Sequence, residues 1–303
     1  MNKVDIAMAT FNGEKFIREQ IASIERQTYS NWQLFISDDG STDNTVKIIK
    51  ELANKNERIT LVNTERQGGV VENFNKALSA TEAEYVVLSD QDDIWPEERL
   101  ARLVETIEKY KNQHSNKSLL VFTDLEVIDK NGNIKESSFY QTNNIEPYEN
   151  MRGNNLLWRS SVYGCTTIVN RKLLDRALPI PQNALMHDQW LALHASQENG
   201  LYYFDYCSIK YRQHDNNVTG GSKKNLLEKL KSFPKSYKVI NKDISKTKKN
   251  MVEYNYLYKN GRGKISTRKD FIIFAFKEVF PHIFKGSKKM YSFFAFLSFV
   301  LAK

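Results

Sequence analysis

The chain has 303 residues, which is enough for a full α/β core and an appendage. Of these residues, 41% are hydrophobic and 26% are charged, as is ordinary for a folded globular protein. Two cysteines are too few for a disulfide framework, and they form no CxxC pair of the kind that binds zinc. The net charge of +8 is uneven, because carboxylates crowd the first half and lysines dominate after residue 222. This asymmetry indicates a neutral-to-acidic body and a basic tail that meets an anionic partner, either nucleic acid or anionic lipid.

Apolar runs alternate with amphipathic stretches from the start of the chain. Strands are expected at residues 4–10, 32–37, 59–63 and 84–89. Helices are expected at residues 14–27, 42–55, 70–80 and 96–111. Ser41 is a candidate N-cap for the second helix. This alternation predicts an α/β fold with a mostly parallel sheet covered on both faces, whose ligands bind at the carboxyl ends of the strands.

The pattern loosens after residue 118. Strands are expected at 119–129 and 163–170, helices at 171–178 and 188–197, and one or two further strands within 200–214. Residues 135–160 are polar and are assigned no structure. The opening residues MNKVDIAMATFNG contain no long apolar run, so we expect no signal peptide and a cytoplasmic protein.

Two acidic segments follow predicted strands. DDGS occupies residues 38–41 and SDQDD occupies residues 89–93. Each has an ordinary explanation, as a turn or as charge at a helix N-terminus. Paired carboxylates at the end of a buried strand are also the oxygen ligands that Mg²⁺ and Mn²⁺ prefer. Since neither GxGxxG nor GxxxxGK[ST] occurs, a bound nucleotide would need such a metal to neutralise its diphosphate.

The combination of TFNGE, DDGSTDNT and SDQDD resembles glycosyltransferase family 2. The resemblance is strong over residues 3–130 and looser to about residue 220. It implies an inverting enzyme with the GT-A fold, which binds a nucleoside-diphosphate sugar. The later segments HDQW and YRQHDNNVTG are similar to the rhamnosyltransferase-like subgroup of bacterial surface-polysaccharide synthesis.

The resemblance implies a nucleotide pocket built from the first strands. Thr10 and Phe11 would line the base pocket, and Asp39 would accept a hydrogen bond from the imide N–H of a pyrimidine. The segment GGVVENF, residues 68–74, matches the part of the family that covers the donor, which makes Asn73 a donor contact.

The resemblance also implies a metal and a base. Asp90 would lie near the ribose or the sugar, and Asp92 would hold Mg²⁺ or Mn²⁺ on the diphosphate, while Asp93 is an additional carboxylate without an assigned role. Asp188 of MHDQW would be the base that removes the acceptor proton. His214 would approach the diphosphate or the metal. An Asp at a helix start is otherwise an N-cap, and a loop histidine is otherwise an ordinary polar residue.

The C-terminal segment is basic and partly apolar. Its two apolar runs, 270–284 and 288–302, are shorter than the roughly 18 to 20 residues that span a bilayer. Aromatic residues flanked by lysines are typical of the membrane interface, and the alternatives are a helical pair packed on the enzyme body or a dimer contact. We therefore expect a GT-A domain over 1–220 and a helical extension over 221–303.

The sequence thus predicts an inverting, metal-dependent glycosyltransferase at the inner face of the cell membrane. L-rhamnose from dTDP-rhamnose is the first expectation, and transfer from a UDP-hexose is the alternative. The acceptor would be a growing surface glycan or a lipid-linked saccharide, with no nucleic-acid partner. A nucleotidyltransferase would show a glycine-rich basic loop, which ATFNGEKF does not match. A non-catalytic binder of anionic surfaces or nucleic acid, driven by the lysine tail, is the remaining alternative.

Overall fold

The computed structural model describes residues 2–151, 154–214, 233–253, 265, 267–284 and 289–301. The chain divides into two compact units. One comprises residues 1–140 with 162–212, and the other comprises residues 141–161 with 213–303. The boundary expected at residue 220 lies outside the described residues, so it stays a prediction.

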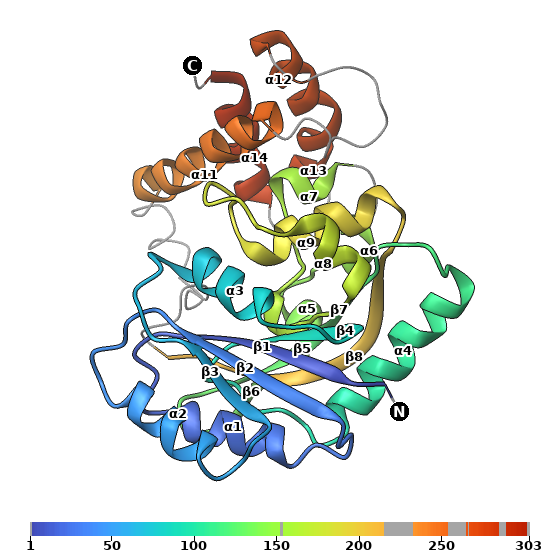
Figure 1. Ribbon diagram of the computed structural model, residues 1–303. Helices are drawn as coiled ribbons and strands as arrows, with labels where there is room; N and C mark the ends of the chain where they lie inside the picture. Colours follow the sequence, from blue (N-terminus) through green and yellow to red (C-terminus); the bar gives the residue numbers. More distant parts are fainter. Residues whose placement is uncertain are drawn as a thin grey trace. The chain divides into compact units, whose positions relative to one another are not determined.

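The first unit is built on one sheet. Its strands are β1 (Val4–Thr10), β2 (Trp32–Asp38), β3 (Ile59–Asn63), β4 (Tyr85–Ser89), β5 (Leu120–Ile128), β6 (Ile134–Glu136), β7 (Ile168–Asn170) and β8 (Leu201–Arg212). Their order is β3-β2-β1-β4-β7-β5-β6, and the long β8 pairs with β5 (Figure 1). β1 to β4 are mutually parallel where they pair, β8 is parallel to β5, and β6 and β7 are antiparallel to their neighbours. The mostly parallel α/β sheet predicted from the sequence is confirmed.

Helices cover both faces of this sheet. Those of the first unit are α1 (Ile17–Glu25), α2 (Thr45–Ala53), α3 (Val70–Ser79), α4 (Arg99–Gln113), η1 (Gly164–Thr166), α8 (Arg171–Ala177) and α9 (His187–Gln197), and α5 (Phe139–Thr142) ends its first segment. α1 and α2 lie on one face and α3 on the other (Figure 1). Ile6 and Met8 of β1 pack with Ile17 and Ile21 of α1 in the main apolar cluster, because alternate strand residues share a face.

The parallel strands bring three loops to one edge. β1, β2 and β4 are adjacent, and they end at Thr10, Asp38 and Ser89. The chain order reverses between β1 and β4, since β2 and β3 lie on one side of β1 and β4 on the other. Ligands of such sheets bind outside the carboxyl ends at this reversal. The loops TFNGE, DDGS and SDQDD all begin there.

Several local boundaries differ from the predicted ones. α1 begins at Ile17 rather than at residue 14, because Glu14 is held in the preceding loop by its carboxylate bonds to Asn44. Ser41 does not cap α2, which begins at Thr45 with Asn44 at its N-cap. The strand expected at 163–170 is reduced to β7 preceded by η1, and residues 200–214 form the single strand β8.

The second unit combines the C-terminal helices with a segment that the sequence left unassigned. Its helices are α6 (Pro147–Asn150), α7 (Asn155–Trp158), α11 (Phe233–Glu253), α12 (Arg268–Phe274), the π-helical turn η3 (Ala275–Val279), α13 (Pro281–Phe284) and α14 (Lys289–Leu301). The Tyr291 hydroxyl donates to the Trp158 carbonyl at 3.0 Å, and the Asn154 amide donates to the Glu278 carboxylate at 3.1 Å. None of the helices in the described ranges is long and apolar enough to cross a bilayer.

Candidate active site

The loops after β1 and β2 form one hydrogen-bonded structure centred on Asp38. The buried Asp38 carboxylate accepts bonds from the Thr10 hydroxyl at 2.8 Å, from the Ser41 amide at 2.7 Å and from the Ser41 hydroxyl at 2.6 Å. The Asn12 amide donates to the Ser41 hydroxyl at 2.7 Å, and the Asn12 side chain accepts from the Thr42 amide at 2.9 Å. TFNGE and DDGS therefore fold as a unit, and the Thr10 side chain points into it.

Asp39 is oriented by backbone amides. Its own N–H donates to the Thr10 carbonyl at 2.9 Å, and its Oδ1 accepts from the amides of Gln67 and Gly68, the latter at 2.9 Å. The side chain is buried, and Oδ2 takes no part in these bonds. One oxygen thus holds the loop after β3, and the bond that Asp39 is expected to accept from a pyrimidine imide N–H stays a prediction.

Phe11 is fixed by a side chain of the acidic loop. The Phe11 amide donates to Gln91 Oε1 at 2.9 Å, and Gln91 Nε2 donates to the Phe11 carbonyl at 2.9 Å. A Cβ at Gly13 would meet Gln91 Oε1 at 2.2 Å, so this contact requires glycine there. The Phe11 ring is 41% exposed, and the Arg66 guanidinium lies 5.5 Å above its centre. An exposed aromatic face beside a cation suits a nucleobase and its phosphates.

Asn73 on α3 is buried and already bonded. Its Nδ2 donates to the Thr10 carbonyl at 3.0 Å, and its Oδ1 accepts from the Ser37 hydroxyl at 2.6 Å. These bonds tie α3 to the ends of β1 and β2. The donor contact expected of Asn73 stays a prediction, and its bonds support a role in holding the two loops.

The acidic loop after β4 contains a compact cluster. One ligand atom each from Asp90, Asp93 and Cys165 lies within 4.8 Å of the others. Desolvation, followed by the charges of Asp92 and Asp188, raises the pKa of Asp90, and burial with the charges of Asp92 and Asp90 raises that of Asp93. Burial also raises the pKa of the Cys165 thiol, which therefore stays protonated. Burial and mutual repulsion therefore both favour the protonated forms of these carboxyl groups.

Asp188 lies in the first turn of α9. Its Oδ2 accepts from the Gly164 amide at 3.0 Å, and its Oδ1 accepts from the Gln189 amide at 2.6 Å. Burial raises its pKa to about 6 although both hydrogen bonds lower it. The His187 ring stacks on Phe74 with centroids 3.9 Å apart, and burial lowers its pKa to about 3, so it is neutral.

The family model described as glycosyl transferase family 2 matches residues 5–178, more than half of the chain. The chain belongs to glycosyl transferase family 2. The family membership expected from TFNGE, DDGSTDNT and SDQDD is thereby confirmed.

Two relatives of this glycosyltransferase extend over most of its length. The dTDP-rhamnosyl transferase RfbG of Shigella flexneri is 28% identical over 231 residues, which cover 71% of this chain and 74% of RfbG. The UDP-Glc:alpha-D-GlcNAc-diphosphoundecaprenol beta-1,3-glucosyltransferase WfgD of Escherichia coli is 28% identical over 228 residues, which cover 74% of this chain and 82% of WfgD.

Solved structures share the fold. Staphylococcus aureus TarS 1–349 in complex with UDP-GlcNAc has a TM-score of 0.55 at 18% identity and covers 90% of this chain and 80% of its own. The mannosyltransferase PcManGT from Pyrobaculum calidifontis, in complex with GDP-Man and Mn²⁺, has a TM-score of 0.54 at 15% identity and covers 100% of this chain and 88% of its own. These similarities confirm the GT-A fold of this family 2 glycosyltransferase.

The residues of the acidic loop suit a hard divalent cation. Asp93 Oδ2 is buried and has no hydrogen-bond partner among the described residues. A buried carboxylate oxygen without a partner is unfavourable, and a cation would supply one. A protonated thiol is a poor ligand for Mg²⁺ or Mn²⁺, which prefer oxygen. The carboxylates of Asp90 and Asp93 are therefore better ligands for such a cation than Cys165. The roles expected for Asp92, which lies outside this cluster, and for His214, which belongs to the second unit, stay predictions.

Two cationic side chains near these loops were missed by the sequence analysis. Arg99, the first residue of α4, is fully buried; it donates to the Cys165 carbonyl at 2.6 Å and lies 4.0 Å over the Trp95 ring. Its charge lowers the pKa of Asp90 and Asp93. Arg66 lies above Phe11. A basic residue six positions after Asp93 could have suggested Arg99, whereas nothing in the local sequence distinguishes Arg66.

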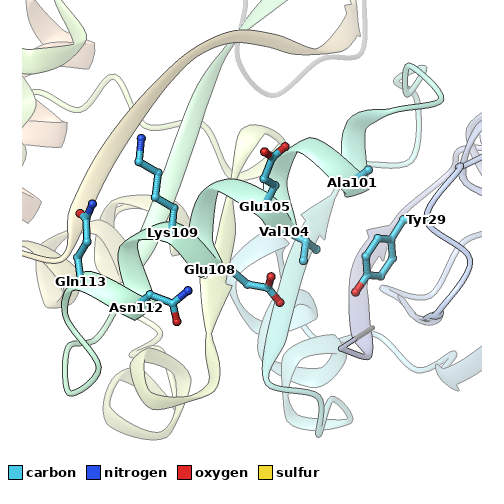
Figure 2. A pocket seen from close by; sticks show the side chains of 8 residues that line it. All are labelled: Tyr29, Ala101, Val104, Glu105, Glu108, Lys109, Asn112 and Gln113. Carbon is cyan, nitrogen blue, oxygen red and sulfur yellow. The ribbon is translucent and has the colours of Figure 1, made fainter.

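A surface depression on α4 is separate from these loops. Figure 2 shows side chains from successive turns of the helix, with Tyr29 at the end where Ala101 and Val104 lie. The lining residues are Tyr29, Ala101, Val104, Glu105, Glu108, Lys109, Asn112 and Gln113. α4 starts after the carboxyl end of β4 and runs back along the sheet, and Tyr29 precedes β2. The depression therefore lies toward the amino edge, away from the carboxylate cluster.

Proposed function

We propose that this glycosyltransferase moves a sugar, with inversion, from a nucleoside-diphosphate sugar to a growing bacterial surface glycan. The observation that carries the proposal is the convergence of carboxylates from two distant elements. The charges of Asp90, Asp93 and Asp188 all act on the Cys165 thiol, and that of Asp188 acts on Asp90. Inverting transfer needs a diphosphate-binding group and a general base in one place. The reason is that the acceptor loses its proton as the diphosphate leaves from the opposite face.

The nucleotide side of the site supports a pyrimidine donor. Asp39 presents one carboxylate oxygen for the imide N–H, and the exposed ring of Phe11 offers a stacking surface for the base. Thymine and uracil share this imide edge, so the pocket does not choose between them. The similarity to RfbG, whose name specifies dTDP-rhamnose, makes that donor the first choice. UDP-sugars appear in the names of WfgD and of the TarS complex, so a UDP-hexose is the alternative.

The carboxylates after β4 would hold the diphosphate end through Mg²⁺ or Mn²⁺. When bound, such a cation acts as a Lewis acid that stabilises the negative charge of the leaving diphosphate. Asp90 and Asp93 would supply its oxygen ligands, with Asp92 as the further ligand expected from the sequence. Arg99 carries a buried positive charge behind the cluster and offsets the repulsion between these carboxylates.

Asp188 would act as the general base. Two backbone amides hold its carboxylate in one orientation, so little ordering remains to be done when the acceptor binds. A pKa of about 6 leaves it ionised near neutral pH and makes it a stronger base than an ordinary Asp. The acceptor hydroxyl would donate to this carboxylate and lose its proton to it in the transition state.

The test is sugar transfer in vitro from matched donors. The protein is incubated with Mn²⁺, a diphospho-lipid-linked saccharide, and either dTDP-rhamnose or UDP-glucose, and the product's anomeric configuration is determined by NMR. We expect release of one nucleoside diphosphate for each sugar transferred, and a glycosidic bond inverted relative to the donor. A product with retained configuration, or a folded protein that binds neither nucleotide, would refute the proposal.

We also propose that the second unit attaches the enzyme to an anionic membrane surface on its cytoplasmic side. The rings of Phe276, Phe280, Phe284 and Phe296 form a contiguous ridge with centroid spacings of 5.0 to 5.8 Å. Phe276 is 53% exposed and Phe284 is 66% exposed. From residue 221 onward there are 20 Lys and Arg against 5 Asp and Glu, whereas residues 1–220 contain 24 against 31. Exposed aromatic rings beside excess cations support an interfacial location.

Vesicle sedimentation tests this attachment. We expect binding to phosphatidylglycerol vesicles but not to phosphatidylcholine vesicles, with roughly tenfold weaker binding in Phe276→Ser/Phe284→Ser, since both rings leave the interface. The control is Ile134→Ser, which removes an exposed apolar side chain in the first unit. Binding of the double variant to phosphatidylglycerol vesicles that equals that of the wild type would contradict the proposal. Loss of dimerisation in the double variant without loss of vesicle binding would contradict it as well.

A further inference from the structure

The end of β8 is paired with the acidic loop. The Ile94 amide donates to the Lys210 carbonyl at 3.1 Å, and the Lys210 amide donates to the Ile94 carbonyl at 2.9 Å. Two residues further on, the Arg212 amide donates to Asp93 Oδ1 at 3.2 Å. The loop that carries Asp90, Asp92 and Asp93 is therefore held along its length by the last residues of β8.

The Arg212 side chain bonds to the acidic loop as well and adds contacts to two other segments. Its Nε donates to the Asp92 carbonyl at 2.9 Å, its Nη1 donates to the Lys130 carbonyl at 3.1 Å, and its Nη2 donates to the Glu19 carboxylate at 2.6 Å. Its guanidinium lies 4.9 Å over the Phe16 ring. The side chain is only 2% exposed, whereas that of Glu19 is 52% exposed. One buried cation thus connects the acidic loop, the β5–β6 turn and the first turn of α1.

We propose that Arg212 is a positioning residue for the cation and diphosphate end of the site. Its backbone fixes a carboxylate oxygen of Asp93, and its side chain fixes the peptide of Asp92, so both residues are held although their charges repel. This inference rests on the proposed function of the loop. YRQH was singled out in the sequence for His214, and the structure assigns its arginine a separate task.

The planar guanidinium is essential to this arrangement. Its Nε and both Nη atoms point in fixed directions, so it can bond two carbonyls and one carboxylate at once. A lysine keeps the charge but cannot reproduce the three directions. Arg212→Lys should therefore leave the sheet folded while the acidic loop loses its tether to α1. Glu19→Gln keeps an acceptor and removes its charge, so it should change the same properties less.

Two measurements on the full chain test the proposal. Hydrogen exchange by mass spectrometry reports on peptides covering residues 88–95 without any ligand, and calorimetry reports the Mn²⁺ dependence of dTDP or UDP binding. For Arg212→Lys we expect faster exchange in 88–95 and about tenfold weaker Mn²⁺ affinity, because supporting side chains around metal ligands typically contribute 10- to 100-fold. Saturating Mn²⁺ should restore nucleotide binding. Arg18→Lys is the control, since Arg18 lies next to Glu19 on α1, forms an exposed ion pair with Glu51 of α2 and should change neither measurement.

The outcomes separate the two proposals. Faster exchange with weaker Mn²⁺ affinity supports the positioning role. A lower melting temperature of Arg212→Lys with unchanged exchange in 88–95 and unchanged Mn²⁺ affinity would overturn it and leave a structural role alone. If the wild-type chain binds no nucleotide with Mn²⁺, the proposed function fails, and the exchange data still decide whether Arg212 holds the loop.

Discussion

Replacing Asp188 by Asn removes the charge of the candidate base and keeps the size of its side chain. In the wild type, one carboxylate oxygen accepts from Gly164 and the other from Gln189. Asn retains a single acceptor oxygen, so one of these bonds is lost. A positioned general base contributes roughly 10² to 10⁴ in rate, and we expect kcat to fall by at least about 100-fold.

The same substitution should change stability in a pH-dependent way. Burial raises the pKa of Asp188 from 3.8 to about 6, so keeping the carboxylate ionised in the folded state costs about 3 kcal/mol above pH 6. Asn avoids this cost and loses one buried hydrogen bond, worth about 1 to 3 kcal/mol. At pH 8, Asp188→Asn should therefore be as stable as the wild type or up to about 2 kcal/mol more stable.

The pH dependence of stability follows from proton binding to the Asp188 carboxylate. Because the folded pKa is the higher one, the stability that this carboxyl contributes is fully present below pH 3.8 and is lost as pH rises through about 6. Urea unfolding between pH 4 and pH 8 should therefore move the free-energy difference toward Asp188→Asn by about 2.5 kcal/mol. In parallel, wild-type kcat/KM should fall as pH decreases through about 6. The control is Asp175→Asn, which changes an exposed carboxylate on α8. An active variant, or a stability difference independent of pH, would refute the base assignment.

Three further substitutions test the contacts around the site. Gly164→Ala places a Cβ 2.4 Å from His187 Nε2, so thermal unfolding should show a loss of stability of roughly 1 to 3 kcal/mol. Adding His187→Ala should recover part of this stability. An unchanged stability in Gly164→Ala would mean that the His187 ring moves freely. Gln91→Glu cannot donate to the Phe11 carbonyl, so the Kd for UDP measured by calorimetry should rise about tenfold, with little change in kcat. An unchanged Kd would contradict a role of the Gln91–Phe11 hydrogen bonds in nucleotide binding. Asp39→Asn should weaken dTDP and UDP equally, by about tenfold, since both bases present the same imide edge, whereas selective loss of one would contradict that reading.

The sequence was sufficient to predict the sheet and the edge at which the polar loops meet. Strands and helices alternate with distinct periodicities, and parallel strands bring their carboxyl ends together, so DDGS and SDQDD had to be neighbours. Local boundaries were less predictable. Ser41 looks like an N-cap, yet its hydroxyl bonds to Asp38 and α2 begins at Thr45, because a tertiary contact outweighed the local preference.

Long-range contacts were the part that sequence reasoning could not supply. Arg212 lies 120 positions from Asp92, and no periodicity indicates that its guanidinium reaches that peptide. The assignment of residues 141–161 to the C-terminal helices has the same cause, since the bond from Tyr291 to Trp158 joins residues 133 positions apart. Motifs identify residue types and strand ends, whereas the packing around them depends on the whole fold.

The most direct test of the central claim is calorimetric titration of the purified chain with dTDP and with UDP, in Mn²⁺ and in EDTA, alongside Asp92→Ala and Asp93→Asn. We expect binding that requires Mn²⁺, that both substitutions weaken, and that is tighter for the nucleotide of the true donor. Binding that is equal in EDTA and in both variants would contradict a carboxylate-held diphosphate site after β4.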